Sequence, residues 1–144
     1  MTAPPFILAS SSPRRSELLR SLGLDFSVIP SDANEIHNEQ LTAIEISQLN
    51  AYRKARAVAK QFPDALILGA DTLVYLGTTL FGKPRNMEDA YRMLKQLQGK
   101  THEVVTGVCL LRLRGHRQTI FAESTRVTFR PLGVKEIRDY MGRI

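Results

Sequence analysis

The feature that most constrains this chain lies near its start, where the apolar run 6–9 is followed by three serines and Pro13. An apolar run that ends in serines and a proline, followed by a leucine-bearing segment, is typical of a buried strand, a tight loop and the first turn of a helix. We expect Ser12 to be the N-cap of that helix. Pro13 suits the first helical position, because the N–H group of that position has no intrahelical acceptor.

The same stretch gathers groups that bind anions. The first turn of a helix presents unpaired backbone N–H groups and the positive end of the helix dipole. Three serine hydroxyls, beginning with Ser10, and the guanidinium groups of Arg14 and Arg15 are added at this place. Arginine forms paired hydrogen bonds with phosphate, so these side chains suit a polyphosphate better than lysines would. By itself the stretch is equally compatible with an ordinary capped helix that carries two solvated arginines.

Length and composition narrow the class of protein. The 144 residues are enough for one domain of ordinary size with a real core. No apolar run approaches the roughly 20 residues of a membrane span, and residues 1–5 lack the features of a signal peptide. We therefore expect a globular, cytoplasmic protein without a membrane partner. Cys109 is the single cysteine, which excludes a disulfide framework, and its apolar neighbours indicate a small core residue.

The formal net charge of +6 raises the question of a nucleic-acid partner. The positive residues are spread over the amino-terminal helix, the segment 53–56 and the segment 112–117, with acidic residues between them. They form no single basic block, which makes the charge weak support for DNA binding. An anionic small molecule fits such a distribution equally well.

A second informative stretch runs from Ala65 to Thr72. The continuous apolar run 65–68, bounded by Pro63 and Gly69, predicts a strand that is buried on both faces. This interpretation places Asp71 at the carboxyl end of the strand, where ligand crevices of open α/β sheets form. An acid at that place serves as a general base or a metal ligand. The alternative is an aspartate that caps a turn.

Three further segments carry candidate ligands. The polar loop 31–39 offers Asp32 and Glu35 to a metal, although a solvated acidic loop is the commoner explanation for such a run. Lys54 lies on the polar side of a helix predicted over 43–61, where a basic residue is more often solvated than bound to a ligand. Lys83 follows a predicted hairpin over 73–81 and could place a point charge on a phosphate, although its surroundings are not a Walker A loop.

The rest of the chain predicts regular elements. A second strand is expected over 24–29, and Asn86 is expected to cap an amphipathic helix that ends before Gly99. The β-rich runs 103–113 and 118–129 predict a long antiparallel hairpin, and a further helix is expected to begin at Val134.

Five motifs follow one another along the chain in the order of a known family. They are the segment 9–15 with Glu17-Leu18-Leu19, then Lys54-Ala55, Gly69-Ala70-Asp71-Thr72, Lys83-Pro84-Arg85 and the segment 99–107. Together they resemble the Maf family of nucleoside triphosphate pyrophosphatases over essentially the whole chain. Five motifs in register are far more specific than any single motif.

This resemblance implies a fold, a reaction and a set of site residues. The fold is α/β, with a mixed twisted sheet, flanking helices and a deep nucleotide-binding cleft of the Maf/Ham1, ITPase-like kind, in one domain over residues 1–144. The reaction is hydrolysis of a nucleoside triphosphate to the monophosphate and pyrophosphate with Mg²⁺ or Mn²⁺. Asp71 resembles the family's general base and, with Glu35, its metal ligand. The residues that resemble its substrate-binding groups are Ser10, Arg14, Arg15, Lys54, Thr72 and Lys83.

Two positions point to a branch of the family. Pro13 is followed directly by Arg14, and Thr72 follows Asp71, whereas the branch that acts on methylated guanine nucleotides has a large residue and a glutamine at these places. The resemblance therefore implies dTTP and UTP as substrates.

Two alternatives are kept: a non-catalytic nucleotide-binding regulator of cell division, and a nucleic-acid-binding domain, which the absence of a recognition-helix or RNA-binding pattern disfavours. We expect a nucleoside triphosphate as the partner and no nucleic acid, and we keep a homodimer as an alternative to a monomer.

The resemblance also implies a carboxyl-terminal part after residue 144, with a lysine-alanine-glycine segment and a glutamine that contacts the base. A polypeptide that ends at Ile144 is expected to bind the triphosphate through Ser10, Arg14, Arg15 and Lys83 and to discriminate poorly between bases. We also expect it to self-associate, because a sheet without its final strands exposes an unpaired edge.

Overall fold

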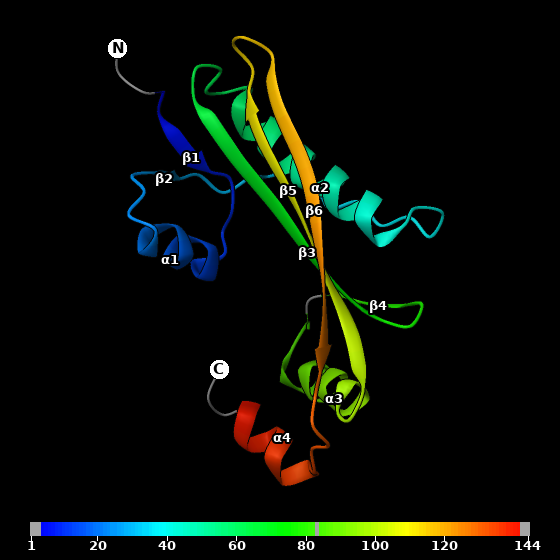
Figure 1. Cartoon of the computed structure of the whole chain (residues 1–144). Helices are drawn as coiled ribbons and strands as arrows, with labels where there is room; N and C mark the ends of the chain where they lie inside the picture. The colour runs from blue at the N-terminus through cyan, green and yellow to red at the C-terminus, as the bar shows by residue number, and fades with distance from the viewer. Residues whose placement is uncertain (1–3, 83, 142–144) are drawn as a thin grey trace. The chain divides into compact units, whose positions relative to one another are not determined.

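The computed structural model describes residues 4–82 and 84–141, which form two compact units. The first unit comprises Met1–Thr72 and Thr106–Glu123, and the second comprises Leu73–Val105 and Ser124–Ile144. The long strands β3 (Leu66–Leu76), β5 (Thr101–Arg112) and β6 (Arg117–Thr128), labelled in Figure 1, contribute residues to both. The elements follow in the order β1 (Phe6–Leu8), α1 (Pro13–Ser21), β2 (Ser27–Val28), α2 (Ala43–Ala59), β3 (Leu66–Leu76), β4 (Thr79–Phe81), α3 (Met87–Leu97), β5 (Thr101–Arg112), β6 (Arg117–Thr128) and α4 (Val134–Met141).

The described residues form one mixed sheet of six strands in the order β2-β1-β3-β5-β6, with β4 paired to β3. Strand β1 pairs in parallel with both β2 and β3, with Ile7 opposite Ser27 and Ile67. Strand β4 is antiparallel to the end of β3. This mixed α/β arrangement confirms the predicted fold class. No helix in the described ranges is long and apolar enough to cross a membrane.

Local signals in the sequence explain where the helices begin. The Ser12 side chain accepts a hydrogen bond from the Arg15 N–H group, as expected for an N-cap, and Pro13 opens α1. Helix α2 begins with a capping box between Thr42 and Glu45, in which each side chain bonds the other residue's backbone N–H. The hydrogen bond from the Thr42 backbone lowers the pKa of Glu45, since it favours the ionised carboxylate.

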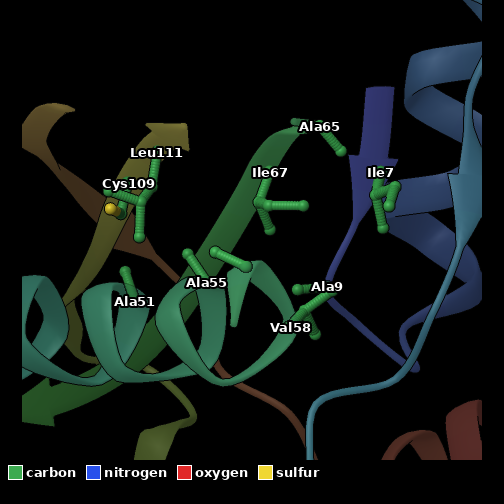
Figure 2. Close-up of a cluster of buried hydrophobic side chains, with 10 residues drawn as sticks. Ile7, Ala9, Ala51, Ala55, Val58, Ala65, Ile67, Cys109 and Leu111 are labelled. Atoms are coloured by element: carbon green, nitrogen blue, oxygen red, sulfur yellow. The ribbon is translucent and has the colours of Figure 1, made fainter. Parts of the chain in front are cut away.

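The core of the first unit lies between α2 and the strands. Figure 2 shows Ala51, Ala55 and Val58 of α2 facing side chains of β1, β3 and β5. The cluster also holds Cys109, which is fully buried, as predicted. Burial raises the pKa of its thiol to about 11, so the group stays protonated at neutral pH and packs as a small apolar side chain.

Two glycines allow α2 to lie directly on the sheet. A Cβ atom at Gly69 of β3 would overlap the Ala51 carbonyl oxygen and would lie 2.9 Å from the Ala55 nitrogen. A Cβ atom at Gly107 of β5 would overlap the backbone of Ser47. The short distance between α2 and the strands therefore requires the absence of a side chain at both positions.

The second unit carries α3, α4 and the distal parts of the long strands. Asn86 caps α3, and Gly99 adopts a left-handed conformation after the helix ends, as the sequence predicts. Helices α3 and α4 pack against each other, and the guanidinium of Arg138 lies 5.0 Å from the centre of the Tyr91 ring. The turn at Gly77 joins β3 to β4 in the predicted hairpin.

One prediction about the strand that carries Asp71 is wrong. The sequence predicted a strand that ends before Gly69, whereas β3 continues to Leu76 and Asp71 lies in its middle. The strand continues because Val74 to Leu76 pair with β4. Gly69 does not interrupt the strand. The absence of a side chain there leaves space for the backbone of α2.

Candidate functional site

Asp71 is the centre of the site in the first unit. Its residue is only 3% exposed, and both oxygens of its carboxylate accept hydrogen bonds from α2. Lys54 Nζ lies 3.2 Å from Oδ1, and Asn50 Nδ2 lies 3.2 Å from Oδ2. Residues four apart lie on the same face of a helix, so α2 presents both donors to β3 together. A buried carboxylate requires such partners, because burial without them is costly.

Lys54 joins Asp71 to a second carboxylate. Its ammonium group lies 3.0 Å from Oε1 of Glu35 and donates another hydrogen bond to the Ala70 carbonyl oxygen at 3.3 Å. The Glu35 side chain is 48% exposed, so it faces solvent while that of Asp71 does not. Two carboxylates, one buried and one open to solvent, therefore share one cation.

The backbone beside Glu35 is held by Asn50. The Ile36 N–H group donates to Oδ1 of Asn50 at 2.7 Å, and Asn50 Nδ2 donates to the Ile36 carbonyl oxygen at 3.0 Å. Asn50 thus forms one hydrogen bond with the catalytic candidate Asp71 and two with the loop that carries Glu35.

The segment before α1 forms the second half of the site. The Ser10 hydroxyl accepts hydrogen bonds from the Ser12 N–H group at 3.1 Å and from Nη1 of Arg15 at 3.2 Å. Nη2 of Arg15 donates to Oγ1 of Thr72 at 3.0 Å, and Thr72 lies 3.1 Å from the hydroxyl of Thr106. Arg15 thereby connects the loop before α1 to the residue that follows Asp71.

The charge of Arg15 is available to an anion. Its side-chain hydrogen bonds to Ser10 and Thr72 go to neutral hydroxyl groups. Burial lowers the pKa of the guanidinium, and the negative charges of Asp71 and Glu35 oppose that effect. Arginine stays protonated at any pH the protein meets, so a positive charge lies beside the first turn of α1.

The structure brings together six of the eight residues proposed from the sequence: Ser10, Arg15, Glu35, Lys54, Asp71 and Thr72. Arg14 is exposed on the first turn of α1, next to Arg15. Lys83 lies outside the described residues.

Two members of the site were not identified from the sequence. Asn50 precedes Lys54 by one helical turn, which was a usable signal, because a polar residue on the buried face of an amphipathic helix needs hydrogen-bond partners there. Thr106 lies in the motif segment 99–107, but its local pattern does not assign it to the site. It reaches Thr72 only because β5 lies beside β3 in the sheet.

The residues present fit a divalent metal ion. No group of three or more histidine, cysteine, aspartate or glutamate side chains with metal-site geometry occurs within residues 4–82 and 84–141. The oxygens of Glu35 and Asp71 nevertheless meet around one cationic nitrogen, which shows that this place stabilises positive charge. Mg²⁺ is commonly bound by one or two carboxylates, with phosphates and water as its other ligands. Glu35 and Asp71 would supply those carboxylates.

Comparisons with known proteins identify what this chain is similar to. The family model described as Maf-like protein matches residues 5–143. The dTTP/UTP pyrophosphatase of Ruminiclostridium cellulolyticum is 46% identical over 136 residues, which cover 94% of this chain and 70% of the relative. The enzyme of the same name from Akkermansia muciniphila is 45% identical over 138 residues, covering 96% and 72%. That of Deinococcus radiodurans is 46% identical over 143 residues, covering 96% and 70%.

A solved structure supports the fold alone. The Staphylococcus aureus Ham1 protein matches with a TM-score of 0.57 and 15% sequence identity, covering 85% of this chain and 70% of that one. Because the family model spans nearly all of the residues and the relatives are similar along the same range, the chain belongs to the Maf family.

Proposed function

We propose that this chain is a nucleoside triphosphate pyrophosphatase that hydrolyses dTTP and UTP to the nucleoside monophosphate and pyrophosphate. The observation that carries the proposal is the buried carboxylate of Asp71, held by Lys54 and Asn50 beside the Arg15 end of α1. Its relatives are named for this activity, which favours catalysis over the alternative of a non-catalytic regulator. We place this activity in the cytoplasm.

We propose a task for each part of the site. The first turn of α1, with Ser10, Arg14 and Arg15, would bind the phosphates through backbone N–H groups and charge-assisted hydrogen bonds. Asp71 would accept a proton from a water molecule while the oxygen of that water attacks the α-phosphorus. The bond from that phosphorus to the bridging oxygen breaks, and pyrophosphate leaves with the electron pair.

Positive charge must balance the charge that develops on the phosphate oxygens. Arg15 and Lys54 supply part of it from the protein. A divalent metal bound by Glu35 and Asp71 would supply further neutralisation and would lower the energy needed to deprotonate water. Lys54 would keep the two carboxylates close together before the metal binds, because its ammonium contacts both.

The proposal predicts a strict requirement for a divalent metal. In excess chelator we expect pyrophosphate release from UTP to fall to background. Glu35 and Asp71 would then hold no metal ion to neutralise the charge on the phosphate oxygens. Addition of Mg²⁺ or Mn²⁺ in excess of the chelator should restore the rate. The measurement is a coupled assay for pyrophosphate, with orthophosphate assayed in parallel. Undiminished turnover in chelator, or orthophosphate as the product, would contradict the proposed mechanism.

A substrate panel tests the proposed specificity. We expect dTTP and UTP to have the highest kcat/KM among dTTP, UTP, CTP, ATP, GTP and 7-methyl-GTP. The reason is that Thr72, rather than a longer side chain, follows Asp71 and is already engaged by Arg15 and Thr106. Steady-state kinetics with each nucleotide at saturating Mg²⁺ would decide. A higher kcat/KM for GTP or 7-methyl-GTP would refute the pyrimidine assignment while leaving the reaction itself intact.

A further inference from the structure

Asn50 is more deeply buried than Asp71, the carboxylate that it contacts. Its residue is 2% exposed, and its side-chain amide forms all three of the bonds described above. The carbonyl oxygen accepts from the Ile36 N–H group, and the two hydrogens of the amide serve the Ile36 carbonyl and the Asp71 carboxylate. The donor capacity of the group is therefore fully used.

These partners determine the orientation of the amide. Exchange of its oxygen and nitrogen would place an acceptor against two acceptors, Oδ2 of Asp71 and the Ile36 carbonyl oxygen. It would also place a donor against the Ile36 N–H group. Only one orientation satisfies all partners, so the side chain is a rigid link between the loop and β3.

We propose that Asn50 is a positioning residue that holds Glu35 and Asp71 in the relative placement needed to bind the divalent metal. The proposal rests on the pyrophosphatase function proposed above. Lys54 contacts the same two carboxylates, but it reaches Glu35 only through two long, flexible side chains. Asn50 instead fixes the backbone of the residue that follows Glu35, and in the same step it fixes one oxygen of Asp71.

The proposal predicts a defined loss in the Asn50→Leu variant, which keeps most of the volume and removes all three hydrogen bonds. Mutation of a residue that orients metal ligands typically weakens metal affinity or activity by about 10- to 100-fold. We expect a rise of that size in the dissociation constant for Mn²⁺, measured by electron paramagnetic resonance. The half-saturating Mn²⁺ concentration for pyrophosphate release should rise similarly. The KM for UTP should change little, because the hydrogen bonds of Asn50 go to Ile36 and Asp71 and leave the phosphate-binding turn of α1 as it is.

Ser47→Ala is the matched control. Ser47 lies on the same helix and is also fully buried, but its hydroxyl donates to the Ile44 carbonyl oxygen of its own helix, at 3.0 Å. This variant should bind Mn²⁺ as the wild type does. A merely structural role for Asn50 would lower the amount of folded protein in its variant and leave the Mn²⁺ dissociation constant of the folded fraction unchanged.

A double-mutant cycle identifies the route of the effect. If Asn50 acts through Glu35, the loss of Mn²⁺ affinity caused by Asn50→Leu should largely disappear in a Glu35→Gln background. Additive losses would contradict the proposal.

In the wild-type protein the Ile36 amide should exchange slowly with solvent, because its N–H group is bonded to a buried acceptor. A rapidly exchanging Ile36 amide would overturn the proposal without any variant. A wild-type chain that binds Mn²⁺ but releases no pyrophosphate would contradict the proposed function alone.

Discussion

Asp71→Asn is expected to lower kcat for UTP by about 10²- to 10⁴-fold, the usual cost of losing a general base. The amide has nearly the shape of the carboxylate, but it does not accept a proton from the attacking water. The phosphate-binding turn of α1 is untouched by this change, so the KM for UTP should stay near that of the wild type. Steady-state pyrophosphate release at saturating Mg²⁺ measures both constants.

Asp64→Asn is the control for this substitution. This substitution makes the same chemical change at the surface, where the Asp64 carboxylate is paired with Arg114. Surface ion pairs contribute little to stability, so this variant should fold and turn over like the wild type. If Asp71→Asn also retained near-normal turnover, Asp71 would have a structural role and another group would have to accept the proton.

Gly69→Ala is expected to destabilise the chain by about 3 kcal/mol, at the upper end of what overpacking costs. The new methyl group would meet the backbone of Ala51 and Ala55, and backbone cannot move aside as a flexible side chain can. Helix α2 would have to move away from β3, and this shift would separate Lys54 and Asn50 from Asp71. We therefore expect a lower kcat in the folded fraction as well, with urea denaturation giving the loss of stability.

Gly82→Ala provides the comparison. Apart from its chain neighbours, a Cβ atom there would meet no heavy atom of the described residues within 4 Å, and the backbone of Gly82 is not left-handed. Its unfolding free energy should lie within about 0.5 kcal/mol of the wild type. Equal stability of the Gly69→Ala and Gly82→Ala proteins would show that α2 can shift on the sheet without cost.

Local patterns predicted most of the regular structure. Ser12 and Pro13 specify the start of α1, and Thr42 with Glu45 specifies that of α2, because capping involves groups within one turn of each other. The cap of α3 was predicted for the same reason. The hairpins were predicted because their turns also involve residues close together in the sequence. The sequence also predicted most of the candidate site, since Ser10, Arg15, Lys54 and Asp71 belong to motifs that resemble those of the family.

Tertiary structure alone decided how those residues meet. The length of β3 depends on its pairing with β4, and the reason for Gly69 is visible only where α2 crosses the strand. The bonds of Asn50 to Ile36 and Asp71 connect residues 14 and 21 positions away, and no periodicity of a helix or strand encodes such a separation. A residue type and its local pattern reveal which groups are suited to catalysis. Their burial, distances and partners arise only when distant segments pack together, because desolvation and hydrogen-bond geometry are properties of the assembled fold.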